Sequence, residues 1–128
     1  MWVRKPEVSF ADARGEIIDL LANEDIHAVT IVTFRKGAVR GNHYHQQTTQ
    51  WNYVLSGRLE LHAELPQEER RKVVLDPGDL AMIAAGERHA FVALDETTLA
   101  VFTRGPRGGK EYESDTFRID PPLVEPGR

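Results

Sequence analysis

The sequence has 128 residues, of which 41% are hydrophobic and 28% are charged, proportions typical of a single soluble globular domain. It contains no cysteine, which excludes disulfide bonds and thiolate metal sites, and its net charge of −4 argues against a nucleic-acid partner. Because no apolar stretch approaches the roughly 20 residues that span a membrane and no secretion signal is recognisable, we expect a cytoplasmic protein with no membrane partner.

The first 25 residues are expected to form an arm that precedes the core. A helix over Asp12 to Asn23 would have few apolar positions and would contain Gly15, so an arm or a short strand is the better interpretation. From Ala28 to Phe34 the pattern changes to a β-branched alternation, with Val32 and Phe34 on one face and Val29, Ile31 and Thr33 on the other. This alternation predicts the first strand of the core.

Further short strands are predicted along the chain, most of them separated by turn residues. They cover residues 43–45, 51–55, 58–65, 71–75, 80–84, 90–94 and 98–104. Many short strands without convincing helices between them predict an all-β sandwich or barrel. We expect one domain over 1–128, with its core at about 26–104 and a docked C-terminal tail at 105–128.

His43 and His45 are the first candidate functional residues. They are two positions apart on a predicted strand, so both imidazoles should leave the same face with Cα atoms about 6 to 7 Å apart. Such a pair suits a metal ion or acid/base chemistry. On its own the pattern also fits surface or hydrogen-bonded histidines.

The surroundings of this pair resemble the first motif of the cupin superfamily. Gly37, five residues, His43, one residue, His45, four residues, Gln50, six residues and Gly57 follow the spacing of that motif, with Gln50 where most cupins have glutamate. The resemblance implies an all-β, double-stranded β-helix fold, also called a jelly-roll barrel.

The second cupin motif is matched by Gly78, Gly86 and His89, while Ala84 and Ala93 replace the usual proline and asparagine. The resemblance implies that His43, His45, Gln50 and His89 converge on one pocket. There they could bind a divalent metal ion such as Zn, Mn, Fe or Ni, and no organic cofactor is expected. A neutral Gln50 would leave the metal charge uncompensated and weaken its binding.

Two groups of cupins are more specifically similar. The run Arg40-Gly41-Asn42-His43-Tyr44-His45, followed by Gln50, resembles sugar-nucleotide 3,4-ketoisomerases, which work without metal, although Tyr44 replaces their usual alanine. The same run is similar to the cupin domain of capsular polysaccharide reductases, which holds a metal. Residues 10–17 resemble the opening segment of the ketoisomerases and 3,5-epimerases, and residues 112–118 resemble their closing segment.

These resemblances imply an isomerase or epimerase acting on a nucleotide-linked keto sugar, with His43 and His45 moving the proton. Arg40 is a candidate for holding the diphosphate, and Asn52, on the face of Gln50, is a further candidate for binding the substrate. Two alternatives stay open: a metal-dependent, oxygenase-like enzyme with a three-histidine site, and a non-catalytic cupin that binds a small molecule.

The remaining candidates have simpler interpretations. If Gln50 faces the pocket, Trp51 and Tyr53 face outward, where large apolar groups often mark a partner surface, so we expect a homodimer. The alternative is that the N-terminal arm covers both within one chain. His27 and His62 fit no motif, and Tyr112 and Arg118 are expected to dock the tail rather than to act in catalysis.

Overall fold

A computed structural model of the chain describes residues 1–107 and 113–126. Its strands agree with the prediction that the fold is all-β. They are β1 (Trp2–Arg4), β2 (Val8–Asp12), β3 (Gly15–Ile18), β4 (Ala28–Phe34), β5 (Val39–Tyr44), β6 (Thr49–Ser56), β7 (Leu59–Glu64), β8 (Arg71–Leu75), β9 (Leu80–Ile83), β10 (Arg88–Ala93), β11 (Thr97–Arg104) and β12 (Phe117–Arg118).

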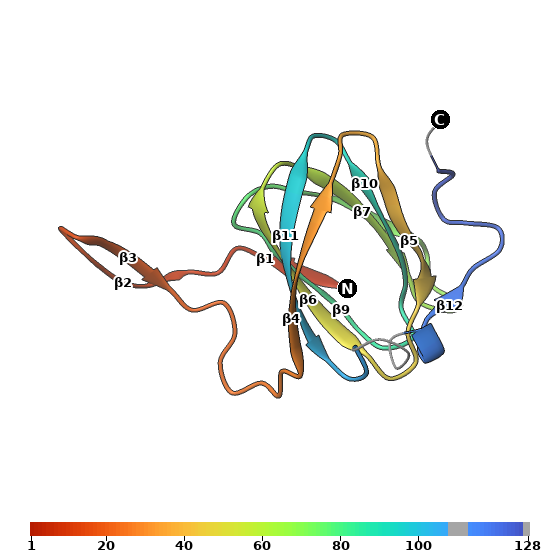
Figure 1. Ribbon diagram of the computed structural model, residues 1–128, viewed down its shortest axis with the longest axis horizontal. Coiled ribbons are helices and arrows are strands. Elements are labelled where there is room, and N and C mark those ends of the chain that lie inside the picture. The colour runs from red at the N-terminus through yellow and green to blue at the C-terminus, as the bar shows by residue number, and fades with distance from the viewer. Residues whose placement is uncertain (108–112, 127–128) are drawn as a thin grey trace.

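Two five-stranded antiparallel sheets face each other and form the barrel (Figure 1). One has the order β1-β9-β6-β11-β4, the other has the order β12-β5-β10-β7-β8, and β2 and β3 pair separately. This is the predicted jelly roll. Within the described part of the chain, no helix is long and apolar enough to cross a membrane.

The core fills the space between the sheets. On β7, Leu59, Leu61 and Ala63 are fully buried, whereas the alternating Glu60 and His62 are half-buried on the other face. Each fully buried leucine contributes about 1.5 to 3 kcal/mol relative to an exposed one. The inward residues of the other strands complete the cluster, namely Phe34, Val54, Leu75, Ala81, Ile83, Phe91, Ala93, Leu99 and Val101.

The prediction of a partner surface at Trp51 is wrong, because this side chain is only 4% exposed within one chain. Strand β1, which we did not predict, adds to the edge of the sheet and sets Trp2 beside Met82, the cross-strand neighbour of Trp51. The Arg104 guanidinium lies 5.3 Å from the centre of the Trp51 ring and pairs with Glu24. The N-terminal segment therefore covers Trp51, as the alternative interpretation held, while Tyr53 is half-buried.

The N-terminal arm carries a β-hairpin, β2–β3, that projects away from the barrel (Figure 1). At its turn the Asp12 carboxylate accepts hydrogen bonds from the backbone and the guanidinium of Arg14. The apolar residues Val8, Phe10 and Ile17 are each about half exposed, with fractions of 46%, 53% and 58%. Residues 10–17, which resemble the opening segment of the ketoisomerases, thus lie in an exposed hairpin.

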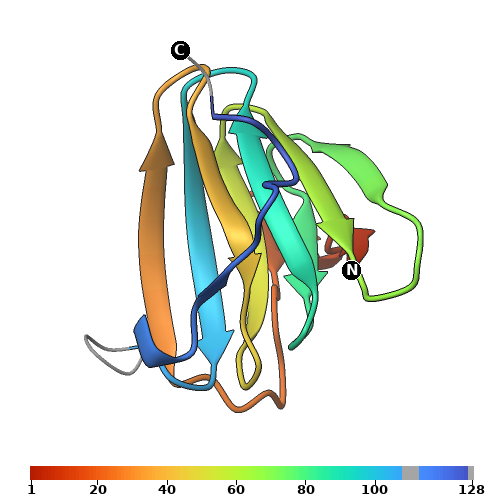
Figure 2. The same ribbon diagram turned by 90° about the vertical axis from the view of Figure 1, so that its right-hand side faces the viewer.

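The C-terminal tail runs along the outside of the barrel beside β5 (Figure 2). Strand β12 pairs with the end of β5, and the Asn42 side chain exchanges two hydrogen bonds with the backbone of Val124. Leu123 is buried, which agrees with the expected docking of the tail. Tyr112 lies outside the described residues.

Candidate functional site

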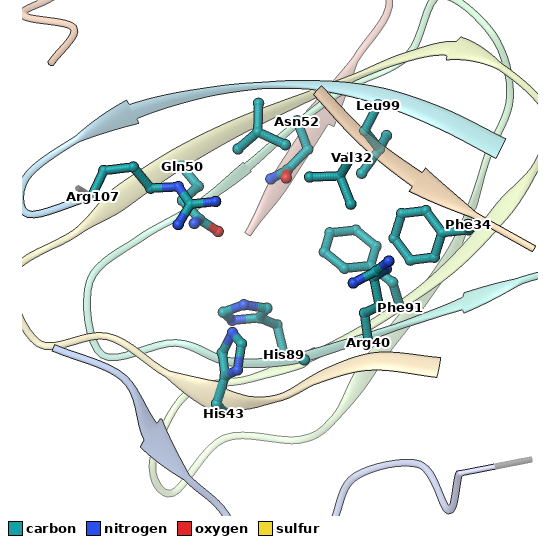
Figure 3. A pocket seen from close by; sticks show the side chains of 12 residues that line it. Val32, Phe34, Arg40, His43, Gln50, Asn52, His89, Phe91, Leu99 and Arg107 are labelled. Atoms are coloured by element: carbon teal, nitrogen blue, oxygen red, sulfur yellow. The ribbon is translucent and has the colours of Figure 1, made fainter. Parts of the chain in front are cut away.

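A cavity of about 300 Å³ lies between the two sheets and is called here the central cavity (Figure 3). His43, His89, Gln50 and Arg107 lie toward one end, and the edge-to-face pair Phe34 and Phe91 lies toward the other, beside Arg40. The lining residues are Val32, Phe34, Arg40, Gly41, His43, Gln50, Asn52, His89, Phe91, Leu99, Val101 and Arg107.

His43, His45 and His89 form a histidine cluster at the end of the cavity near Gln50 and Arg107. The ring centre of His43 lies 4.8 Å from the ring centre of His45 and 4.8 Å from that of His89. The ring centres of His45 and His89 are 5.6 Å apart. His43 and His89 line the cavity, whereas His45 is not among its lining residues and is 2% exposed. The sequence prediction that the three histidines meet is in agreement with this geometry.

The local backbone explains how β5 and β10 bring His43 against His89. The two strands pair His43 with His89, and the register then shifts so that Ala90 faces Gly41. Gly41 has a φ of 97°, and a Cβ there would come within 2.9 Å of the His89 carbonyl oxygen. Glycine at 41 therefore allows the close approach. Strand β5 ends at Tyr44, so His45 follows the strand instead of belonging to it as expected.

Two hydrogen bonds set the tautomers of the buried histidines. His45 Nδ1 lies 2.9 Å from the backbone oxygen of Asp115, and His89 Nδ1 lies 3.0 Å from that of Glu87. A carbonyl oxygen can only accept, so in the neutral rings Nδ1 carries the hydrogen and Nε2 keeps a lone pair. Both rings therefore offer Nε2 as an acceptor, a base or a metal ligand.

Burial keeps the histidine cluster neutral. Loss of hydration, together with the neighbouring imidazoles, lowers the pKa of His43 to about 3 and that of His89 to about 4. Burial also lowers the pKa of His45. At neutral pH all three rings are unprotonated.

The low pKa of His89 predicts acid sensitivity. Between its ordinary value of 6.5 and about 4, the unfolded chain binds a proton at His89 that the folded chain does not, so stability falls as the pH is lowered through this window. We expect a slope of up to about 1.4 kcal/mol per pH unit from this residue. Urea unfolding in a chelator at several pH values between 7.5 and 4.5 measures it. The slope should be shallower in His89→Gln, and an equal slope in both proteins would contradict the assignment.

The donor set of the histidine cluster fits a divalent metal ion. One ring nitrogen from each histidine lies within 4.8 Å of the others, and neutral imidazole is the form that binds metal. Gln50 also lines the cavity and could add its amide oxygen. Within the described part of the chain no carboxylate lines the cavity, so the lining groups described there would leave the metal charge uncompensated.

The two candidates for substrate binding also line the central cavity. Arg40 donates a hydrogen bond to the Thr33 backbone oxygen, and its guanidinium lies 5.3 Å from the centre of the Phe34 ring. Asn52 is buried and donates to the Ala81 backbone oxygen. Their roles in substrate binding stay predictions.

Arg107 is the lining residue that the sequence reasoning missed. It lies across the cavity from His43 and His89, beside Gln50 (Figure 3). Its sequence context, a loop rich in glycine and proline, gave no signal that this arginine would turn inward.

The other histidines lie outside the central cavity. The His27 ring accepts a hydrogen bond from the Gly105 backbone, and His62 is paired with Glu60. Arg118 lies opposite His43 on the β12–β5 pair.

The family model described as a cupin domain matches residues 30–103. The chain belongs to the cupin family. The matched segment starts in β4 and ends in β11, so it contains both predicted motifs and the whole histidine cluster of this cupin. No curated protein sequence matched the chain.

Among solved structures, this cupin is similar in fold to enzymes of nucleotide-linked sugars. The dTDP-4-dehydrorhamnose 3,5-epimerase from Sulfolobus tokodaii is 21% identical, with a TM-score of 0.75 over 91% of this chain and 75% of that one. A sugar 3,4-ketoisomerase from Thermoanaerobacterium thermosaccharolyticum, solved with TDP, is 21% identical, with a TM-score of 0.75 over 93% and 88%. A 3'-monoepimerase from Streptomyces bikiniensis, solved with dTDP-quinovose, is 18% identical, with a TM-score of 0.77 over 94% and 69%.

Proposed function

We propose that this cupin is an isomerase or epimerase acting on a nucleotide-linked keto sugar by proton transfer from carbon. The observation that carries the proposal is the charge of the central cavity. Arg40 and Arg107 line it with neutral His43 and His89, and among residues 1–107 and 113–126 no carboxylate lines it, although the chain as a whole is acidic. Such a cavity favours an anionic ligand, and the similar solved structures bind or act on nucleotide-linked sugars.

The size of the cavity supports a binding mode in which only the sugar part of the ligand lies inside it. A volume of about 300 Å³ is at the small end of ligand pockets, enough for a sugar ring but not for a whole nucleotide sugar. The sugar would lie between the histidine cluster and Arg107, and the diphosphate would extend outward. Arg40, whose planar guanidinium can hold phosphate oxygens through two hydrogen bonds, is the candidate to bind it.

In the proposed reaction, a neutral histidine removes a proton from the carbon next to the keto group. His43 is a stronger candidate for this base than His45, because His43 lines the cavity and His45 is not among its lining residues. The electron pair left on carbon moves into the carbonyl to give an enediolate, whose negative oxygen Arg107 can stabilise. Returning the proton to the other face of the same carbon gives the epimer. Returning it to the former carbonyl carbon gives the isomer, provided that the hydroxyl proton of the enediolate moves to the former carbonyl oxygen.

An anionic substrate also offsets the low pKa of the cluster. Negative charge close to an imidazole favours its protonated form, so a bound enediolate raises the pKa of His43 above its value in the free protein. The proton then has a stable position on the histidine until it returns to carbon.

The alternative function is a metal-dependent cupin enzyme, favoured by the three imidazole nitrogens of the histidine cluster. His43, His45 and His89, with Gln50 beside them, would hold Zn, Mn, Fe or Ni, and the metal would supply a Lewis acid. The third possibility is a cupin that binds a small molecule without converting it.

Deuterium exchange tests the proposed function. We expect the protein to incorporate deuterium from D₂O into dTDP-4-keto-6-deoxyglucose or another nucleotide-linked 4-keto sugar, at a carbon next to the keto group, even after chelation. The His43→Ala/His45→Ala variant should show only background exchange. Stoichiometric metal lost in that variant, with chelator-sensitive turnover, would support the metal-dependent alternative. Saturable binding without exchange would support the non-catalytic one.

We also propose that the protein is a homodimer, but through the β2–β3 hairpin instead of Trp51. An isolated two-stranded hairpin is marginally stable in water, and this one exposes Phe10 and Ile17. Strand β4 is one of the two edge strands of its sheet, pairs only with β11 among the described residues, and exposes Val29 and Ile31 at 65% and 59%. The hairpin of a second copy would cover this strand and pair with its free edge.

Light scattering after size-exclusion chromatography tests the dimer. We expect twice the chain mass of 14.5 kDa for the unmodified protein and a monomer for Phe10→Asp/Ile17→Asp. Val74→Asp, which places one aspartate at an exposed apolar site on β8 of the other sheet, should stay dimeric. A monomeric unmodified protein, or a dimer that survives both charges, would count against the hairpin interface.

A further inference from the structure

We propose that Asp115 is a positioning residue that fixes the tautomer of His45 from the C-terminal tail. His45 and Asp115 are 70 positions apart, and neither cupin motif contains residue 115. The contact nevertheless determines which nitrogen of a site histidine carries hydrogen. Its consequence for turnover rests on the proposed function, whereas the tautomer itself does not.

The Asp115 carboxylate is buried and binds the loop that follows His45. It accepts hydrogen bonds from the backbone N–H of Gln46 at 3.0 Å, from that of Gln47 at 3.1 Å and from the Thr48 hydroxyl at 2.7 Å. The side chain is 3% exposed. A buried carboxylate bound by three donors is held firmly in one place.

The same residue presents its backbone oxygen to the histidine. With the Asp115 carboxylate fixed on residues 46–48, its carbonyl lies 2.9 Å from His45 Nδ1. The β12–β5 pair, with Phe117 stacked on Tyr44 at 5.3 Å between ring centres, holds the following residues of the tail on the barrel. Asp115 therefore holds the loop at 46–48 through its carboxylate and His45 through its backbone carbonyl.

His89 offers a built-in comparison. Its Nδ1 donates to the carbonyl of Glu87, two residues earlier on the same chain segment, so its tautomer is determined locally. His45 Nδ1 instead faces the carbonyl of Asp115, which lies 70 positions away in the tail. A disturbance at Asp115 should therefore affect His45 and leave His89 unchanged.

Asp115→Asn is the variant that tests this role. The amide has one acceptor oxygen and an NH₂ group, so it cannot accept from all three donors and places its own donor against one of them. The loop and the tail then separate, and the carbonyl at 115 loses its fixed position. Glu113→Gln removes the same charge from an exposed residue two positions away and is the matched control.

The measurement is the ¹⁵N spectrum of the histidine rings in the metal-free protein, which distinguishes the two tautomers without any substrate. In Asp115→Asn we expect the Nδ1–H form of His45 to fall by about half or more, with His89 unchanged. Glu113→Gln should match the unmodified protein. An unchanged His45 in folded Asp115→Asn would overturn the proposal.

If Asp115→Asn does not fold, Thr48→Val removes one donor and keeps the carboxylate. A smaller shift of His45 in the same direction supports the role, and no shift overturns it. Where a sugar substrate is converted, kcat should fall about tenfold or more in Asp115→Asn with KM little changed. A tautomer shift in a protein that converts no keto sugar would keep the positioning role and remove the proposed function.

Discussion

Replacing His43 with glutamine is expected to slow deuterium exchange into the keto sugar by about 10² to 10⁴-fold. Glutamine keeps a polar side chain on the wall of the central cavity but cannot accept the proton from carbon. The ring of His43 is the part of the histidine cluster that lines the cavity next to His89. Binding of the nucleotide part should be retained, because Arg40 lies toward the other end of the cavity (Figure 3).

Two measurements on the same samples separate chemistry from binding. Exchange is followed by mass spectrometry, and binding of the keto sugar is followed by calorimetry. His62→Gln is the matched control, since His62 pairs with Glu60 outside the cavity and should exchange at the rate of the unmodified protein. Full activity in His43→Gln would exclude His43 as the base and leave His45 or His89, whereas a loss of binding alone would assign His43 to substrate recognition.

Gly57→Ala is expected to destabilise the fold by about 3 kcal/mol or more, or to prevent folding. Gly57 closes the first cupin motif in the β6–β7 turn, where its φ is 94°. A Cβ at this position would overlap the backbone oxygen of Glu96 and the side chain and Cα of Thr97. The turn cannot move away easily, because the Thr97 hydroxyl accepts a hydrogen bond from the Arg58 backbone N–H at 3.0 Å.

Gly37→Ala measures the energetic cost of the left-handed backbone conformation without a steric overlap. Gly37 opens the same motif with a φ of 87°, but a Cβ there would have no atom within 4 Å. This variant should cost only about 1 kcal/mol, the penalty of placing alanine in a left-handed conformation. Both free energies come from urea unfolding. Equal losses in the two variants would show that the overlap at Gly57 is relieved by local movement.

The barrel and the histidine cluster could be predicted because each rests on a local signal. Alternation of apolar residues from Ala28 to Phe34 and from Leu59 to Ala63 determines which face of each strand is buried, and the structure has both strands in place. The spacing of His43, His45 and His89 carried the resemblance to cupins. The predicted strand at 43–45 was too short and shifted, because its first residues, including Gly41, do not alternate.

The remaining features depend on contacts between distant segments. Strand β1 has three residues, too few for a recognisable alternation. Together with Glu24 it nevertheless covers Trp51, which would otherwise lie on the surface. Arg107 and Asp115 come from the chain between β11 and β12, where nothing in the local sequence indicates a neighbour near position 45. Such contacts follow from the packing of the tail and not from local periodicity.

The walls of the central cavity come from both sheets, with Asn52 and Val101 on one and His43 and Phe91 on the other. The cavity therefore exists only when the two sheets are closed on each other. A ligand that binds between them stabilises the closed state against unfolding, by about 2.7 kcal/mol when its free concentration is 100 times its dissociation constant. The melting temperature of this protein is thus a direct reporter of cavity occupancy, and a panel of nucleotide sugars can be ranked by it before any reaction is known.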